Sequence, residues 1–127
     1  MHQRLADEKK GVGDRRGVER EFKRGSLELV VLHLLAPGES YGYEIVTKVT
    51  KQTNGALGLT DGTLYPLLYR LEREGFVTVR WETPERGVPR KYYRLTDAGR
   101  AELARLINEW TSFTKAMAIL LRREEGK

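Results

Sequence analysis

The residues with the clearest capacity for chemistry lie between Asp61 and Val77. Four leucines recur there at helical spacing and predict a helix with one buried side: Leu64, Leu67, Leu68 and Leu71. The other side chains are expected to point outward: Thr63, Tyr65, Pro66, Tyr69, Arg70 and Arg73. Hydroxyl, aromatic and guanidinium groups suit the edge of a nucleic-acid groove, where they can bind phosphates and base edges. The alternative is a solvated face whose two tyrosines are half packed at its border.

A hairpin with a basic tip is predicted directly after this helix. Gly75 occupies the place of a helix-terminating glycine, and the alternation over 77–82 is typical of a half-buried strand. Residues 84–87 have turn chemistry, and a second strand over 90–95 precedes Thr96, a suitable helix N-cap. Three cations are expected to bind phosphates as part of a wing: Arg86, Arg90 and Lys91. An ordinary solvated hairpin is the alternative, but its position beside the helix favours a wing.

Composition agrees with a polyanionic partner and argues against catalysis. The chain has 127 residues and a net charge of +5, which favours nucleic acid through counterion release. It has no cysteine, so disulfides, thiolate zinc sites and cysteine nucleophiles are excluded. With only two histidines and no nucleophile–base or carboxylate cluster, we expect no enzyme, no cofactor and no metal site. No stretch has the apolar length of a membrane span or a signal peptide, so we expect a cytoplasmic protein.

Three regions are predicted along the chain. Residues 1–24 are expected to form a flexible basic tail, because they contain too few apolar residues for a core. Residues 25–96 are expected to form a winged helix-turn-helix domain, whose first helix is apolar nearly all round and whose second begins at Tyr41. Residues 97–127 are expected to form one long helix. The predicted fold class is therefore mainly α with a small β-hairpin: a winged helix-turn-helix plus a long C-terminal dimerisation helix.

The long helix has an apolar stripe that needs a covering surface. Its members alternate at spacings of three and four residues: Leu103, Leu106, Trp110, Phe113, Met117 and Leu120. This is the pattern of a seam between helices. Because a winged helix is already closed by its own elements, the stripe predicts a homodimer. Two-fold symmetry would place two recognition helices at the fixed spacing of a palindromic operator in double-stranded DNA.

Four motifs resemble the PadR transcriptional regulators. They are Tyr41-Gly42-Tyr43-Glu44-Ile45, Gly62-Thr63-Leu64-Tyr65-Pro66, Arg70-Leu71-Glu72 with Glu74-Gly75, and Arg90-Lys91-Tyr92-Tyr93-Arg94-Leu95-Thr96 with Gly99. The resemblance runs from about Gly25 to the C-terminus, and the single long final helix is similar to the short subfamily. It implies a homodimeric winged-helix repressor with the helix after Asp61 in the major groove and the hairpin on the backbone. The N-terminal extension departs from the family pattern.

The resemblance also implies that a small, often aromatic effector releases the DNA. The expected effector site is Trp110 with its neighbours Ile107 and Phe113, because two symmetry-related indole rings would form a slot for a planar compound. The alternative is a tryptophan that only packs in the seam. For the whole protein, the alternative function is a winged-helix protein-interaction module that does not bind DNA.

Overall fold

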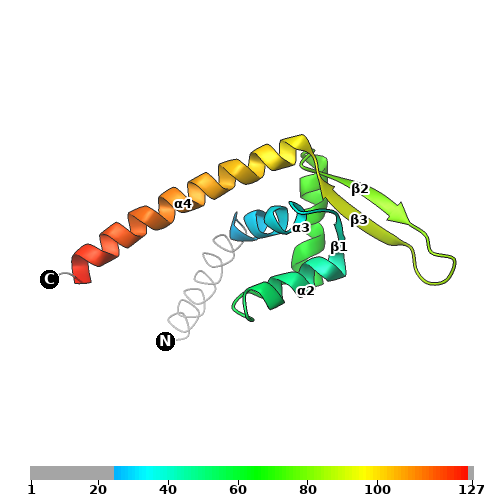
Figure 1. Cartoon of the computed structure of the whole chain (residues 1–127), viewed down its shortest axis with the longest axis horizontal. Helices are drawn as coiled ribbons and strands as arrows, with labels where there is room; N and C mark the ends of the chain where they lie inside the picture. The colour runs from blue at the N-terminus through cyan, green and yellow to red at the C-terminus, as the bar shows by residue number, and fades with distance from the viewer. Residues whose placement is uncertain (1–24, 126–127) are drawn as a thin grey trace, which may run out of the picture.

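The computed structural model describes residues 25–125, so the predicted tail over 1–24 lies outside the described residues. The elements in chain order are a helix over 25–35, β1 (Ser40–Tyr41), α2 (Gly42–Gln52), α3 (Asp61–Arg73), β2 (Val77–Glu82), β3 (Arg90–Leu95) and α4 (Asp97–Glu125). Figure 1 shows the hairpin of β2 and β3 projecting from one side of the helical body and α4 extending from it in the other direction. The predicted class, mainly helical with a small antiparallel sheet, is confirmed. Among residues 25–125, no helix has the length and apolar character of a membrane span.

The sheet has one strand more than the sequence predicts. Its order is β1-β3-β2, and both pairings are antiparallel. Tyr41, expected as the first residue of the second helix, belongs to β1 and pairs with Tyr92 of β3. A strand of two residues is too short to produce an alternating pattern, so only the pairing in space reveals it.

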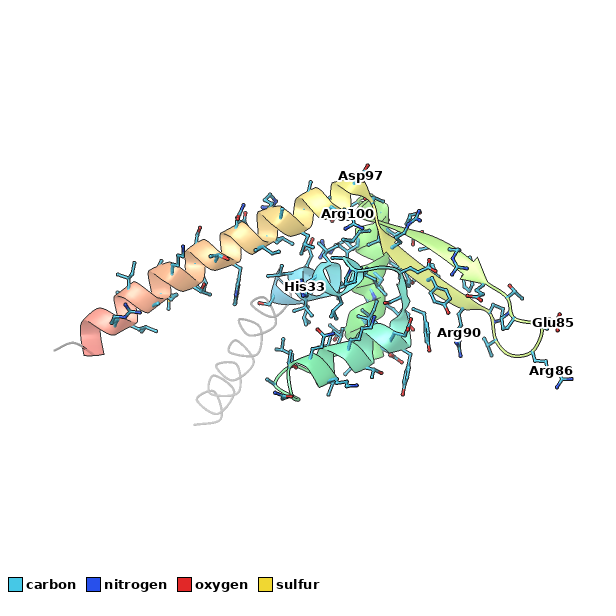
Figure 2. The ribbon with its side chains drawn as sticks, viewed as in Figure 1. His33, Glu85, Arg86, Arg90, Asp97 and Arg100 are labelled. Atoms are coloured by element: carbon cyan, nitrogen blue, oxygen red, sulfur yellow. The ribbon has the colours of Figure 1, made fainter. Side chains whose placement is uncertain are left out.

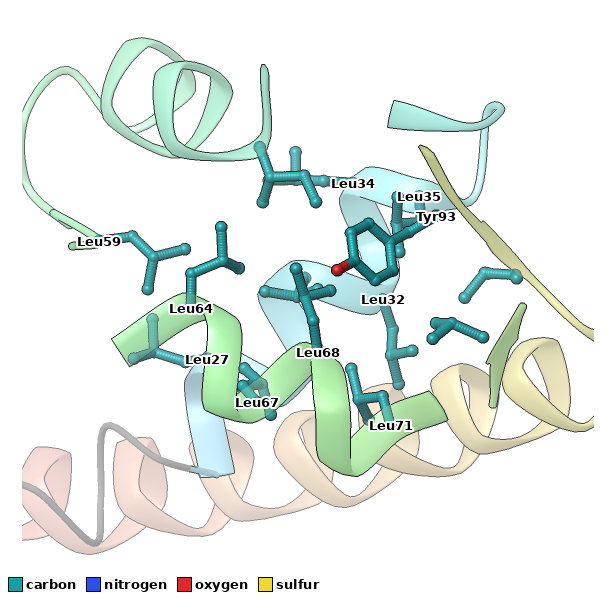
Figure 3. Close-up of a cluster of buried hydrophobic side chains, with 14 of the residues drawn as sticks. Leu27, Leu32, Leu34, Leu35, Leu59, Leu64, Leu67, Leu68, Leu71 and Tyr93 are labelled. Carbon is teal, nitrogen blue, oxygen red and sulfur yellow. The ribbon is translucent and has the colours of Figure 1, made fainter. Parts of the chain in front are cut away.

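The core forms where α3 crosses the helix over 25–35. The four α3 leucines are buried as predicted, and Leu64, Leu68 and Leu71 have no exposed surface at all. Figure 3 shows them facing leucines of the helix over 25–35, with the ring of Tyr93 from β3 lying above them. The burial of each leucine side chain contributes about 1.5–3 kcal/mol to the free energy of unfolding. Rotating α3 about its axis would therefore cost several such contributions.

The start of α4 is fixed to the corner between α3 and β2. The Thr96 hydroxyl accepts a hydrogen bond from the Gly99 N–H (3.0 Å), which confirms the predicted N-cap, and it donates to the Gly75 carbonyl oxygen (2.6 Å). Gly99 packs so closely on this corner that a Cβ there would overlap the carbonyl oxygen of Phe76. Leu103 is buried and Leu106 is half-buried, whereas the apolar side chains that follow are largely exposed. Only the first turns of α4 thus belong to the core.

Gly99→Ala should destabilise the fold. Alanine is ordinarily better than glycine inside a helix, but here its methyl group would displace the backbone of Phe76, at a cost of about 1–3 kcal/mol. Gly58→Ala is the matched control, because nothing lies within 4 Å of a Cβ at that position. Urea denaturation followed by circular dichroism measures both variants. Equal stability of Gly99→Ala and the wild type would contradict the close packing of α4 on this corner.

Candidate nucleic-acid interface

The face of α3 opposite its leucines is open to solvent. Thr63, Tyr65, Pro66, Tyr69 and Arg73 are all exposed, as the sequence predicts. The exposed side chains combine a hydroxyl, two phenols and a guanidinium group. Within residues 25–122, whose side chains are described, Arg73 has no recorded ion pair or hydrogen-bond partner, so its guanidinium is available to an external anion.

Arg70 differs from this group, and the expectation that it points outward is wrong. Its Nη2 donates to Oε2 of Glu28 in the helix over 25–35 (3.1 Å), and its Nη1 donates to Oε1 of Glu74 (3.1 Å). Burial alone lowers the pKa of Arg70, but the hydrogen bonds to Glu28 and Glu74 outweigh it and raise the pKa above its usual value. Because its guanidinium is paired with the carboxylates of Glu28 and Glu74, Arg70 links α3 to the helix over 25–35 and so positions the exposed face.

The N-terminal half of α3 lies close to the start of α2. A Cβ on Gly42 would overlap the hydroxyl of Tyr65 and lie 2.9 Å from its Cζ, so glycine is required for this approach. The start of α2 is held by a hydrogen bond from the Tyr41 N–H to Glu44 Oε1 (3.0 Å). Tyr43, next to Gly42, is 71% exposed. It is not among the contacts that the sequence predicts, although it lies within the quoted motif, because only the approach of Tyr65 to Gly42 places it near α3.

The outer face of the hairpin carries an alternation of rings and guanidinium groups. Arg90 lies 4.7 Å above the ring of Tyr41, Arg80 lies 4.7 Å above the ring of Tyr92, and the two rings are 5.4 Å apart. Arg80 is also bound to Glu39, whose pKa its hydrogen bond lowers. Arg86 lies at the tip of the hairpin, which Figure 2 shows well away from the helical body. Arg86 and Arg90 are both exposed.

Lys91 lies on the other face of the hairpin from Arg90 and faces α3. Its Nζ is 3.5 Å from Oε1 of Glu72, and it lies 5.0 Å from the ring centre of Tyr69. Burial alone lowers the pKa of Lys91, but the interactions with Tyr93 and Glu72 outweigh it and raise the pKa. The three predicted wing cations therefore do not act from one face. Arg86 and Arg90 are open to solvent, whereas the ammonium of Lys91 joins the hairpin to α3.

The predicted effector residues lie together on α4, which extends away from the hairpin (Figure 1). The rings of Trp110 and Phe113 are 6.0 Å apart between centroids and inclined at 41°, and Ile107 lies one helical turn before Trp110. All three side chains are partly exposed, with Trp110 at 38%. They form an apolar surface on a helix that the described part of the chain covers only at its start. In residues 25–122 no group of three or more His, Cys, Asp or Glu side chains could hold a metal ion.

Comparison with known proteins places the chain in a family. The model of the transcriptional regulator PadR-like family matches residues 31–105, from within the helix over 25–35 to the first turns of α4. The chain therefore belongs to the PadR-like family of transcriptional regulators. This membership makes it a regulator and not an enzyme, in agreement with the lack of a predicted catalytic cluster.

Relatives and solved structures agree with this membership. Uncharacterized protein X of Lysinibacillus sphaericus is 31% identical over 104 residues, covering 82% of this chain and 95% of that protein. A PadR-like transcription factor from Bacteroides fragilis has a TM-score of 0.70 at 32% identity and covers 82% of this chain and 98% of its own. Bacillus subtilis PadR in complex with operator DNA has a TM-score of 0.60 at 32% identity, and the match covers 64% of this chain and 46% of that one. This chain thus spans less than half of Bacillus subtilis PadR.

Arg70→Ala and Arg73→Ala should separate a structural arginine from an exposed one. Removing Arg70 leaves the Glu28 carboxylate, whose side chain is only 14% exposed, without its partner. We expect a loss of about 1–2 kcal/mol in unfolding free energy, between the values for surface and buried ion pairs. Arg73→Ala, three residues further along α3, should leave stability nearly unchanged. Urea denaturation of both variants decides this, and equal stabilities would contradict the linking role of Arg70.

Proposed function

We propose that this chain is a homodimeric repressor that binds double-stranded operator DNA and is released by a small aromatic or planar effector. The observation that carries the proposal is the adjacency of two elements with exposed cations and rings. An ion pair between Lys91 of β3 and Glu72 of α3 holds the hairpin, which carries Arg86 and Arg90, beside α3. The structural similarity to a PadR–operator complex supports the same arrangement.

The open face of α3 is the proposed reading surface in the major groove. Thr63, Tyr65, Pro66, Tyr69 and Arg73 supply the donors, rings and positive charge that base edges and phosphates accept. The N-terminal residues of a recognition helix ordinarily meet the bases. Arg70 is not part of this reading surface. It positions the surface by linking α3 to the helix over 25–35 through Glu28.

Tyr43, at the start of α2, is a proposed phosphate contact. Helix-turn-helix proteins lay the first helix of the motif across the backbone, and the phenol of Tyr43 is open at the N-terminal end of α2. Phosphates are accepted at such helix ends because the free N–H groups point toward them. Arg86 and Arg90 are the proposed phosphate contacts of the wing, since their guanidinium groups are exposed.

A protein-interaction module without DNA binding is the alternative, and the character of the surface counts against it. The α3 and hairpin elements present Arg73, Arg86 and Arg90 in the open. Exposed cations gathered in this way favour a polyanionic partner, because binding it releases counterions.

The exposed stripe of α4 is the proposed dimer interface. Its large apolar side chains beyond Leu106 are exposed within the single chain: Ile107, Trp110, Phe113, Leu120 and Leu121. A second copy would cover them and would present two α3 helices to the two halves of a palindromic site. In that dimer, Trp110, Phe113 and Ile107 would line an effector site near the two-fold axis. Repression is supported by the similarity to the Bacillus subtilis protein called negative transcriptional regulator PadR, which is 34% identical over 77 residues.

Salt titration should identify the phosphate contacts of the wing. In the Arg86→Ala, Arg90→Ala double variant, we expect weaker binding to every duplex sequence and a salt slope lower by about two, since each phosphate contact contributes about one. Arg105→Ala is the control, because Arg105 pairs with Glu102 and Glu109 on α4. Fluorescence anisotropy at several salt concentrations measures the slope. A slope unaltered in the double variant would remove the wing from phosphate binding.

Leu120→Glu should dissociate the dimer. Leu120 is 54% exposed in the single chain, and a buried glutamate in the seam would lack a partner. Asn108→Glu adds the same charge away from the stripe and should stay dimeric. Sedimentation velocity at micromolar concentration measures both variants. A wild-type protein that sediments as a monomer while binding a palindromic site tightly would rule out this dimer.

An aromatic titrant should quench Trp110. The chain has two tryptophans, so Trp81→Phe leaves Trp110 as the single emitter. We expect a planar aromatic dye that does not itself bind the duplex to quench this emission and to weaken DNA binding. In Trp110→Ala the dye should no longer release DNA, while the dimer persists. Release that continues undiminished in Trp110→Ala would place the effector site elsewhere.

A further inference from the structure

Trp81 is the large aromatic side chain of the hairpin that the core does not cover. It lies on β2 on the same face as Val77 and Val79, which are buried or half-buried. Trp81 itself is 61% exposed. An exposed indole ring offers apolar area that a binding partner can cover, and covering it would stabilise the complex.

A second exposed ring, that of Tyr69 on α3, lies near the same ammonium group as Trp81. Trp81 pairs across the hairpin with Lys91, whose Nζ is 5.9 Å from the centre of the Trp81 ring and 5.0 Å from that of Tyr69. Tyr69 is 55% exposed. One ammonium group therefore holds together a ring of the hairpin and a ring of the helix, at the corner where the two proposed DNA-binding elements meet.

The charge at this corner is already neutralised within the protein. Glu72 lies 3.5 Å from the ammonium of Lys91, so a phosphate placed there would meet a carboxylate as well as a cation. The other exposed groups at this corner are the largely apolar rings of Tyr69 and Trp81. In the DNA backbone, the group that suits such faces is the deoxyribose, whose carbon edge is uncharged and lies between successive phosphates.

We infer that Tyr69 and Trp81 form an aromatic contact for the deoxyribose of the operator backbone, where the strand passes from the groove at α3 to the hairpin. Lys91 is the positioning residue that holds the two rings at this corner. The inference rests on the proposed function, because it requires DNA on the open face of α3. Arg86 and Arg90 would then bind the flanking phosphates, while the rings of Tyr69 and Trp81 would contact the uncharged deoxyribose.

Salt dependence distinguishes a sugar contact from a phosphate contact. The probe is a duplex that the full-length wild-type protein selects from a random library. We expect Trp81→Ala to bind it about tenfold more weakly, a loss of about 1.4 kcal/mol, with an unchanged salt slope. Trp81→Phe should keep most of the affinity, because a ring remains. Lys91→Met, which keeps the packing but removes the charge, should also leave the slope unchanged.

Fluorescence reports the contact directly. In Trp110→Phe, Trp81 is the single emitter, and we expect the selected duplex to quench its emission and shift it to the blue. Wild-type affinity in Trp81→Ala, or emission of Trp81 unaffected by bound duplex, would overturn the inference while leaving the proposed function intact. A wild-type protein that binds no duplex in a salt-dependent manner would overturn the proposed function itself, and the sugar contact with it.

Discussion

The burial of the α3 leucine stripe against the helix over 25–35 is the interaction on which the other features depend. Leu64, Leu68 and Leu71 have no exposed surface, so the rotation of α3 about its axis is set by the core. A helix whose one side is fixed in this way has no freedom in what the other side presents. The rings and the free guanidinium of the open face are therefore a consequence of where the leucines fall.

Polar contacts further fix the position of α3 and of the hairpin beside it. Arg70 reaches across to Glu28 and ties the flank of α3 to the helix over 25–35. On the other flank, Glu72 holds Lys91 and with it the hairpin. Arg80 and Arg90 stack on Tyr92 and Tyr41, and each such contact is worth about 0.5–1 kcal/mol at exposed sites. The hairpin is thus held at a defined place relative to α3, which its proposed role as a wing requires.

The elements and the buried stripe could be predicted from the sequence because both depend on neighbours along the chain. The α3 leucines repeat at helical spacing, and Thr96 caps α4 through Gly99, three residues away. The partners of the charged side chains could not be predicted in this way. Glu28 is 42 residues from Arg70, so spacing alone gives no reason to pair them.

Which hairpin cations face α3 could not be predicted from the sequence either. Lys91 and Arg90 are adjacent in sequence and equally basic, yet successive residues of a strand point to opposite faces. The register of β2 on β3 and the approach of Tyr69 decide that Lys91 faces α3. The exposure of Trp81 and Tyr43 could not be predicted from the sequence either, since it depends on how the elements pack in space.

The central claim, that the open face of α3 and the hairpin bind DNA together, is tested most directly by nuclear magnetic resonance. Backbone amide signals of the labelled full-length protein are followed while a selected duplex is added. The account predicts that shifts concentrate on Gly62–Arg73, on residues 83–90 and at the start of α2, while α4 beyond Leu106 changes little. Shifts confined to α4, or none at salt concentrations where the duplex is bound, would contradict it.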